Sequence, residues 1–340
     1  MTGPPETMRL ATWNVEWFDN LFDDWGRLID DDGWSGRRDV TRAEQTAAIA
    51  HVLRRIDVDA VMVIEAPDTN RRRDGMLALE SFAARFDLRT RRALIGFPTQ
   101  TQQEIALLYD PDVMEAHHDP GGTAPGSAPP FDRATRVDLD IDGQPDRIVW
   151  SKPPLEALVT PRHGSPLRLI GVHAKSKAPH GARNPAEVTR ISIENRRKQL
   201  AECLWLRARV DEHLAKGESL IVLGDFNDGP GLDEYERLFR RSGVEIVLGE
   251  NGATALHDPH ALHGHAEGAA ATARFRHPAG QGHIDALIDF IMVSPDLMAR
   301  DPVWRIWHPL RDPRLRGDRK LARALLTASD HFPVTLDIAP

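Results

Sequence analysis

The sequence contains one cysteine, no long apolar run and no excess of positive charge. A single Cys203 cannot form an internal disulfide, so disulfide-framed secreted scaffolds are excluded and a reducing compartment is favoured. No apolar stretch approaches the roughly 20 residues of a membrane helix, and the start MTGPPETMRL lacks the basic and apolar segments of a signal peptide. We therefore expect a cytoplasmic protein with no membrane insertion.

Acidic residues outnumber basic ones. The chain has 51 Asp and Glu residues against 43 Lys and Arg residues, a formal net charge of −8. Proteins that hold nucleic acid by bulk electrostatics are usually basic, so that class is disfavoured. An acidic enzyme can still act on phosphates if metal ions and basic side chains around the site supply a positive electrostatic potential.

Apolar segments of strand length recur along the chain, many of them rich in β-branched residues. Two helical patterns lie between them. Thr41 and Glu44 have the spacing of a capping box that opens a helix over about 41 to 57, and residues 186 to 216 form a second helix that Gly217 stops. The expected strands are Leu10 to Val15, Ala60 to Ile64, Ile105 to Tyr109, Leu167 to His173, Leu220 to Leu223, Leu287 to Val293 and Val334 to Ile338.

Strands and helices mixed in this way indicate sheets covered by helices in layers. We find no internal repeat and no segment that marks a domain boundary. The chain is therefore expected to form one domain over residues 1–340, with loop insertions near 18–40, 118–130, 249–283 and 300–328.

Polar side chains stand where the expected strands end or begin. Each one alone could be an ordinary cap, turn or buried side chain. Together they indicate a sheet that presents a polar site at one edge. They are Asn14, Glu16, Glu65, His173, Asp225, Asn227, Asp330 and His331.

Six short motifs occur in a fixed order over residues 9 to 338. The series resembles that of the endonuclease/exonuclease/phosphatase superfamily, which has the deoxyribonuclease-I-like fold. Gly-Asp-Phe-Asn followed about a hundred residues later by Ser-Asp-His is its most specific part. The motifs are Trp13-Asn14-Val15, Val63-Ile64-Glu65, Gly171-Val172-His173, Gly224-Asp225-Phe226-Asn227, Ile288-Asp289-Phe290-Ile291 and Ser329-Asp330-His331.

The resemblance implies a four-layered α/β sandwich, in which two packed mixed β-sheets are flanked by helices. It also implies cleavage of phosphate esters that depends on Mg2+ or Mn2+, both of which prefer oxygen ligands. By resemblance, Glu65 is the principal metal ligand and Asp330 and Asn14 lie nearby. Glu16 stands where some relatives carry an Asp, so it is either a further ligand or an exposed acid beside Trp17.

The resemblance also suggests catalytic roles. His331 would contact the phosphate or act as general base, oriented by the carboxylate of Asp289. Asp225 and Asn227 would position the attacking water and the scissile phosphate, and His173 would assist the leaving group. Asp285 competes with Asp289 for the orienting role; we prefer Asp289, because Phe-Ile-Met-Val-Ser follows it as the family strand would.

Local basic runs bear on the substrate. Residues 71 to 92 have a charge balance of +4 and residues 300 to 323 one of +5, so they would form walls for a polyanion if they rim the site. Lys175 and Lys177, with Arg71 and Arg72, are the candidate substrate-binding residues; each could equally be solvated surface. His257, His260, His263 and His265 suggest a second metal site, but a flexible loop explains them better.

Two function classes remain. The favoured one is a metal-dependent phosphoesterase acting as a nuclease on DNA or RNA phosphodiesters, with a phosphatase or a lipid phosphodiesterase as alternatives within the same chemistry. The other is a non-catalytic binding module that kept the fold. Retention of all the motif acids and both histidines argues against the binding module. We expect a monomer.

Overall fold

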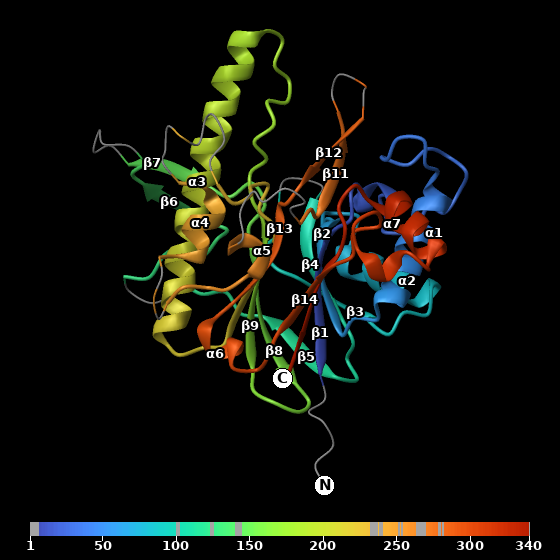
Figure 1. Cartoon of the computed structure of the whole chain (residues 1–340), viewed down its shortest axis with the longest axis horizontal. Coiled ribbons are helices and arrows are strands. Elements are labelled where there is room, and N and C mark those ends of the chain that lie inside the picture. Colours follow the sequence, from blue (N-terminus) through green and yellow to red (C-terminus); the bar gives the residue numbers. More distant parts are fainter. Residues whose placement is uncertain are drawn as a thin grey trace.

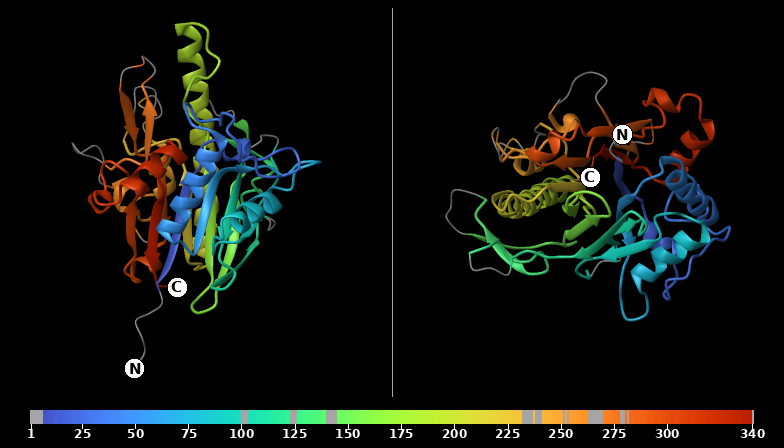
Figure 2. Two further views of the ribbon diagram at one scale, coloured as in Figure 1. Left: turned by 90° about the vertical axis from the view of Figure 1, so that its right-hand side faces the viewer. Right: turned by 90° about the horizontal axis from the view of Figure 1, so that it is seen from below.

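The computed structural model describes residues 7–99, 103–122, 126–139, 145–231, 237, 241–250, 252, 254–262, 270–277, 280 and 282–339. Within these residues two large mixed sheets pack face to face, and helices cover both outer faces (Figures 1 and 2). The predicted four-layered α/β sandwich is confirmed. No helix in these ranges is both long and apolar enough to cross a membrane.

The first sheet has six strands, in the order β14-β15-β1-β2-β4-β3. Its two central strands, β1 and β2, run parallel, so both end at the same edge. In sheet order the strands are β14 (Val303–Ile306), β15 (Val334–Ile338), β1 (Met8–Asn14), β2 (Ala60–Pro67), β4 (Gln103–Tyr109) and β3 (Arg92–Ile95).

The second sheet has five strands, in the order β13-β10-β9-β8-β5. Here β9 and β10 run parallel, and β13 pairs with β10 in the antiparallel sense. The strands are β13 (Asp289–Val293), β10 (Leu220–Asp225), β9 (Leu167–His173), β8 (Leu155–Pro161) and β5 (Met114–His118). Two separate hairpins are formed by β6 (Ala134–Val137) with β7 (Asp146–Val149), and by β11 (Ala273–Arg276) with β12 (His283–Ala286).

Helices form the two outer layers. The outer face of the first sheet is covered by α1 (Arg42–Ile56), α2 (Gly75–Arg85) and α7 (Arg319–Ala328), and that of the second by α3 (Pro185–Ala215) and α4 (Gly243–Leu248). Both predicted helices form within one residue of the expected bounds, and Thr41 caps α1 through the predicted capping box with Glu44. Shorter turns are η1 (Phe18–Leu21), α5 (Pro259–Leu262), α6 (Pro295–Met298) and η3 (Pro313–Leu315).

A fully apolar layer lies between the sheets. Leu10 and Met62 of the first sheet meet Leu169 and Ile221 of the second within one buried cluster. Gly171 of β9 is needed for this close approach, because a Cβ built there would lie 2.4 Å from Sδ of Met62. The sheets are therefore fixed against each other close to the strand ends that carry the polar residues.

Each expected strand is present, and further elements appear where the apolar pattern of the sequence is weaker. Residues 300–328, expected as a loop insertion, contain the edge strand β14 and helix α7, and residues 249–283 contain β11. Figure 1 shows that the β11–β12 hairpin and the first turns of α3 both project from the edge at which β1 and β2 end. They flank the polar site.

Candidate active site

The two sheets are joined at their polar edge by a hydrogen bond between buried side chains. Asn14 ends β1, and its Nδ2 donates to Oδ2 of Asp225, the last residue of β10, at 3.0 Å. Gly224 allows this placement, because its φ is +149° and a Cβ there would lie 2.0 Å from the carbonyl oxygen of Val172. Asn227 completes the turn by donating its backbone N–H to Oδ1 of Asp225 at 2.7 Å. The carboxylate of Asp225 is thus held rigidly at the edge.

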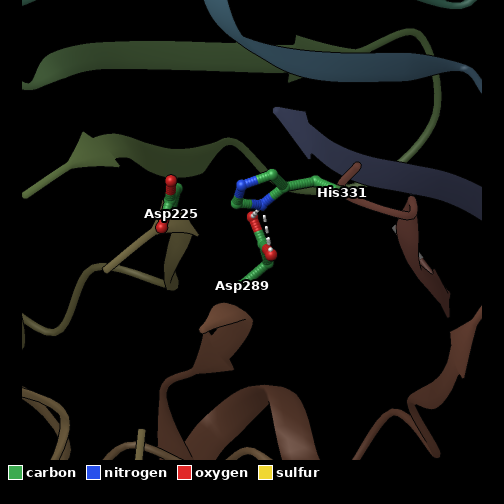
Figure 3. Close-up of side chains that lie close together, drawn as sticks. All are labelled: Asp225, Asp289 and His331. Atoms are coloured by element: carbon green, nitrogen blue, oxygen red, sulfur yellow. Dashed lines mark hydrogen bonds and ion pairs between the residues drawn. The ribbon is translucent and has the colours of Figure 1, made fainter. Parts of the chain in front are cut away.

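Asp225, Asp289 and His331 form a buried cluster whose potential ligand atoms all lie within 4.8 Å of one another (Figure 3). Nδ1 of His331 donates to Oδ2 of Asp289 at 2.9 Å. Burial alone would lower the pKa of His331, but the adjacent Asp289 outweighs it and the pKa is raised well above its ordinary value. Burial, followed by the negative charge of Asp289, raises the pKa of Asp225 to about 6. The preferred Asp289 is therefore the hydrogen-bond partner of His331.

Asp285 has different partners. It lies on β12, where its carboxylate bonds Arg274 at 2.8 Å and also pairs with Arg311. It therefore balances two guanidinium groups, while Asp289 orients the imidazole.

Glu65 lies at a β-bulge, where it has no paired residue on the neighbouring strand β4. The ladder between β2 and β4 shifts between Ile64 and Ala66, and Glu65 itself has φ +66°, in the left-handed region. Its Oε2 accepts the backbone N–H of Trp17 at 2.9 Å and Nε2 of Gln103 at 2.8 Å. Such strain at a carboxylate is a frequent feature of functional sites.

Glu16 and Asp330 lie side by side at the same edge. Oε2 of Glu16 accepts the backbone N–H of Asp330 at 3.2 Å, and it also pairs with Arg37. Burial, together with the charge of Asp330, raises the pKa of Glu16 to about 7. Ser329 fixes this corner, because its Oγ donates to the carbonyl oxygen of Asn14 at 2.7 Å and accepts the backbone N–H of His331 at 3.0 Å. Glu16 is thus part of the polar edge rather than an isolated surface acid.

His173 ends β9 beside Asp225, with 3.8 Å between its Nε2 and Oδ2 of the carboxylate. Nζ of Lys152 lies 3.1 Å from Nδ1 and 3.2 Å from Nε2 of the same ring. Burial, and then the charge of Lys152, holds the pKa of His173 well below its ordinary value. A neutral imidazole and a half-buried ammonium therefore share this side of the site.

Lys152 is a residue that the sequence analysis missed, because nothing in Ser151-Lys152-Pro153 distinguishes it from a loop lysine. Burial lowers its pKa, while Glu65, Asp225 and Glu202 act in the opposite direction. Asp19 was also missed. It is buried beneath the edge, and burial, with the charge of Glu65 next, raises its pKa to about 7.

The expected substrate-binding residues differ in exposure and in their ion-pair partners. Lys175 lies two residues after the end of β9 and is half-buried, and Lys177 forms an ion pair with Asp228. Arg71 and Arg72 are exposed on the loop after β2, and Arg72 pairs with Asp24 at 3.4 Å. Their neighbour Arg73 is buried against Asp68 at 3.0 Å and has a structural role.

The basic run 71–92 does not form one wall. Arg89 bonds Asp57 and Asp59, and Arg91 bonds Asp112, all at the end of the first sheet opposite the polar edge. Only the start of the run lies near Glu65.

Only part of the histidine-rich stretch lies within the described residues. His257 and His260 belong to the described residues, whereas His263 and His265 lie outside them. Across the described ranges, the group of metal-competent side chains found is the Asp225, Asp289 and His331 cluster.

The donor set at the edge fits a hard divalent cation. Oδ1 of Asn14 is buried and has no hydrogen-bond partner among the described residues, and the carboxylates of Glu65, Glu16 and Asp330 belong to the same edge. Mg2+ binds through a few such oxygens and retains several waters. The residues present therefore suit the metal chemistry that the sequence motifs imply.

Comparisons with known proteins agree with this architecture. Residues 11–331 match the model of the Endonuclease/Exonuclease/phosphatase family. Truncated TDP2 from Caenorhabditis elegans is similar with a TM-score of 0.52 and 13% identity, and the match covers 98% of each chain. TDP2 from D. rerio, in complex with a single strand DNA product, has a TM-score of 0.51 and 13% identity over 97% of this chain and 98% of that one. The search of curated proteins gave no match.

Proposed function

Because the chain belongs to the endonuclease/exonuclease/phosphatase family, whose members hydrolyse phosphate esters, we propose that it is a divalent-metal-dependent phosphodiesterase that cleaves nucleic acid. The observation that carries this proposal is the convergence of Asp225, Asp289 and His331 on one buried cluster at the edge that also holds Asn14. A phosphodiester resists attack because it is anionic. Its hydrolysis needs groups that neutralise its oxygens, orient a water and stabilise the leaving oxygen.

The metal would be held by Glu65, Asp330 and Asn14, with Glu16 beside them. When bound, Mg2+ or Mn2+ would supply positive charge for the phosphate oxygens and the leaving oxygen. Oδ1 of Asn14, for which the described part of the chain offers no donor, supports this assignment, since a buried acceptor without a donor is costly unless another group satisfies it.

His331 would bind the scissile phosphate through Nε2. Its Nδ1 donates to Asp289, so the ring orientation is fixed and Nε2 is left to face the substrate. Asp225 and Asn227 would position the attacking water. The carboxylate of Asp225 is oriented by Asn14 on one side and by the backbone of Asn227 on the other, so little reorganisation is needed during the reaction.

His173 and Lys152 would act on the leaving oxygen. The ammonium of Lys152 is close enough to donate to the ring of His173, and both groups lie on the β9 side of Asp225. A positive charge there would stabilise the negative charge that develops when the ester bond breaks.

A nucleic acid is favoured as substrate by cations that lie beyond the scissile position. Lys175 lies two residues after His173, and Arg71 and Arg72 are exposed on the loop after Glu65, where Arg72 also pairs with Asp24. A long polyanion could use these charges, whereas a small ester would not reach them. One similar structure, from D. rerio, is described as bound to a single strand DNA product, which is consistent with such a substrate.

The test is a substrate panel at fixed metal concentration. Plasmid DNA, single-stranded DNA, RNA, an abasic duplex, inositol phosphates and sphingomyelin are each incubated with Mg2+ and with Mn2+, and EDTA is the control. We expect cleavage of a nucleic acid that EDTA abolishes. Preferred turnover of inositol phosphates or sphingomyelin would contradict the nuclease assignment, and no turnover of any substrate by the folded protein would indicate a binding module.

A further inference from the structure

The C-terminus of α7 directly precedes the Ser329-Asp330-His331 turn, so the end of this helix sets where the turn lies. The last carbonyl groups of a helix have no partner within the helix and need donors from outside it. Nη2 of Arg37 donates to the carbonyl oxygen of Leu326 at 3.0 Å, and Nε2 of the fully buried Gln45 donates to that of Ala328 at 3.1 Å. Side chains that are far from α7 in the sequence therefore hold its end.

Glu16 is bound to both of these donors and to the turn. Nη1 of Arg37 pairs with Oε2 of Glu16, and Nε2 of Gln45 donates to the backbone carbonyl oxygen of Glu16 at 2.8 Å. The same Oε2 accepts the backbone N–H of Asp330 at 3.2 Å, and the backbone N–H of Glu16 donates to Oγ of Ser329 at 3.3 Å. Glu16 thus connects the end of β1, the two side chains that cap α7 and the turn itself.

The loop that carries Arg37 is held against the segment that follows β1. Gly36 packs on Trp17, because a Cβ built at Gly36 would lie 2.5 Å from Cβ of Trp17. The side chains of Arg37 and Glu16 are only 14% and 22% exposed. An ion pair withdrawn from water in this way contributes little to stability, because desolvation offsets the attraction between its charges. What it supplies is a fixed orientation of the two side chains.

Arg37 makes Glu16 differ from Glu65 as a possible metal ligand. Within the described residues, the hydrogen-bond donors to Glu65 are neutral groups, the backbone N–H of Trp17 and the side-chain amide of Gln103. The negative charge of Glu65 therefore remains available to a cation, whereas that of Glu16 is balanced by a guanidinium. A dication bound to the carboxylate of Glu16 would lie beside this guanidinium, and the two cations would repel each other.

We propose that Glu16 and Arg37 form a positioning pair that holds the Ser329-Asp330-His331 turn, and that Glu16 is not a ligand of the metal. Through this pair, the loop before α1 fixes the turn from which His331 donates to Asp289 (Figure 3). The statement about the metal rests on the proposed function. The statement about positioning does not, because the contacts that carry it involve only groups of this chain.

The statement about the metal is tested by the affinity for Mn2+, measured from the EPR signal of free Mn2+. The double variant Glu16→Gln, Arg37→Gln keeps the net charge of the pair, and the new amide oxygen at position 16 can still accept the backbone N–H of Asp330. Its Kd for Mn2+ should stay within about threefold of the wild-type value, whereas Glu65→Gln should raise Kd at least about tenfold. An equal rise in both variants would show that Glu16 binds the metal and would overturn this statement.

The statement about positioning is tested without metal, in EDTA, through the ¹H NMR resonance of Nδ1–H of His331, assigned with His331→Gln. This proton belongs to a buried ring and is hydrogen-bonded to Asp289, so it should give a separate downfield resonance. Arg37→Ala should shift or broaden the resonance. Arg37→Lys keeps the charge but loses the two-pronged guanidinium, so its effect should be smaller. The matched control is Arg38→Ala, the neighbouring arginine with a side chain that is 74% exposed, and it should leave the resonance unchanged.

Kinetics on bis-p-nitrophenyl phosphate provide a second readout. Arg37→Ala should lower kcat about tenfold and leave KM within about threefold, because it displaces His331 without removing a contact to the substrate. An unchanged resonance in both Arg37 variants, or the same change in Arg38→Ala, would overturn the statement about positioning. If the wild-type protein bound no Mn2+ and hydrolysed no ester, the proposed function would fail, and the resonance of His331 would still decide whether the pair positions the turn.

Discussion

Nδ1 of His331 donates to the carboxylate of Asp289 at 2.9 Å, and this bond joins the start of β13 to the turn before β15 (Figure 3). Asp289 begins a strand of the second sheet, and His331 lies three residues before a strand of the first. The bond therefore depends on how the two sheets pack. It holds the imidazole at the polar edge, where acidic side chains from both sheets lie.

The first prediction concerns this pair. Replacing Asp289 with Asn keeps the shape but removes the charge that raises the pKa of His331, so the pKa should fall and kcat should drop by about 10³-fold. Turnover of bis-p-nitrophenyl phosphate and NMR titration of the imidazole provide the two measurements. Asp285→Asn is the matched control, because Asp285 pairs with arginines instead, and kcat should stay within about threefold of the wild-type value. The reverse ranking of the two variants would exclude Asp289 as the orienting acid.

The second prediction concerns Asp225 and His331. Groups that act in one transition state have non-additive effects, so the double variant Asp225→Ala, His331→Ala should be only slightly slower than the slower single variant. Steady-state kinetics on the small ester measures all three variants. If the two defects multiply, the residues serve separate steps, and the account of one catalytic unit is incorrect.

The third prediction tests the rim of the site. Charge reversal at Arg71 and Arg72, combined with Lys175→Glu, should raise KM for a long nucleic acid and lower its salt dependence, by roughly one unit of slope per lost phosphate contact. Hydrolysis of bis-p-nitrophenyl phosphate should be preserved. Arg73 is left intact, because it is buried against Asp68 and its reversal would disrupt folding.

The control for this rim variant is Arg54→Glu, an exposed reversal near the last turn of α1 at the opposite end of the first sheet. It should change neither substrate's kinetics. Equal defects of the rim variant on both substrates would place these cations in the catalytic centre instead.

The fourth prediction is a pH dependence of stability. Glu202 is buried within α3, and burial raises its pKa to about 7 in the folded protein, against about 4.5 for an exposed group. Between these two values the folded state binds more protons than the unfolded state, so the free energy of unfolding falls as the pH rises from 4.5 to 7. The loss from this one group is on the order of 3 kcal/mol.

Glu202→Gln removes this titration and keeps an acceptor for the backbone N–H of Lys175, which bonds Glu202 at 2.8 Å. The variant should therefore show a flatter stability profile between pH 5 and 7 in urea unfolding. Glu194→Gln, an exposed position on the same helix, should leave the profile unchanged. An unaltered slope in Glu202→Gln would show that Glu202 is not protonated on folding.

The sequence predicted the layers and the polar edge because both follow from local patterns. The motif strands are strongly apolar and carry a polar residue at or near one end, as in β9 with His173 and β10 with Asp225. Asp289 could be preferred over Asp285 because the apolar segment that follows it resembles the family strand. Short, half-exposed strands such as β6 and β14 carry no such pattern, and α7 was hidden by the charges around its buried Leu321 and Leu325.

Tertiary contacts account for what the sequence could not predict. Lys152 reaches His173 only because the loop before β8 folds over the end of β9. Arg73 and Arg89 are close in sequence to Arg71, yet one is buried and the other pairs with Asp57 at the far end of the sheet. A run of basic residues in the sequence does not show at which end of the sheet its side chains will lie.

The most direct test of the account is the metal dependence of a small diester's hydrolysis. Wild-type protein and Glu65→Gln are compared on bis-p-nitrophenyl phosphate across a titration with Mn2+, with EDTA as the zero point. The account predicts that wild-type turnover is abolished by EDTA, and that Glu65→Gln is slower by orders of magnitude at limiting Mn2+ and partly recovers at high Mn2+. Turnover that persists in EDTA, or equal rates for both proteins at limiting metal, would contradict it.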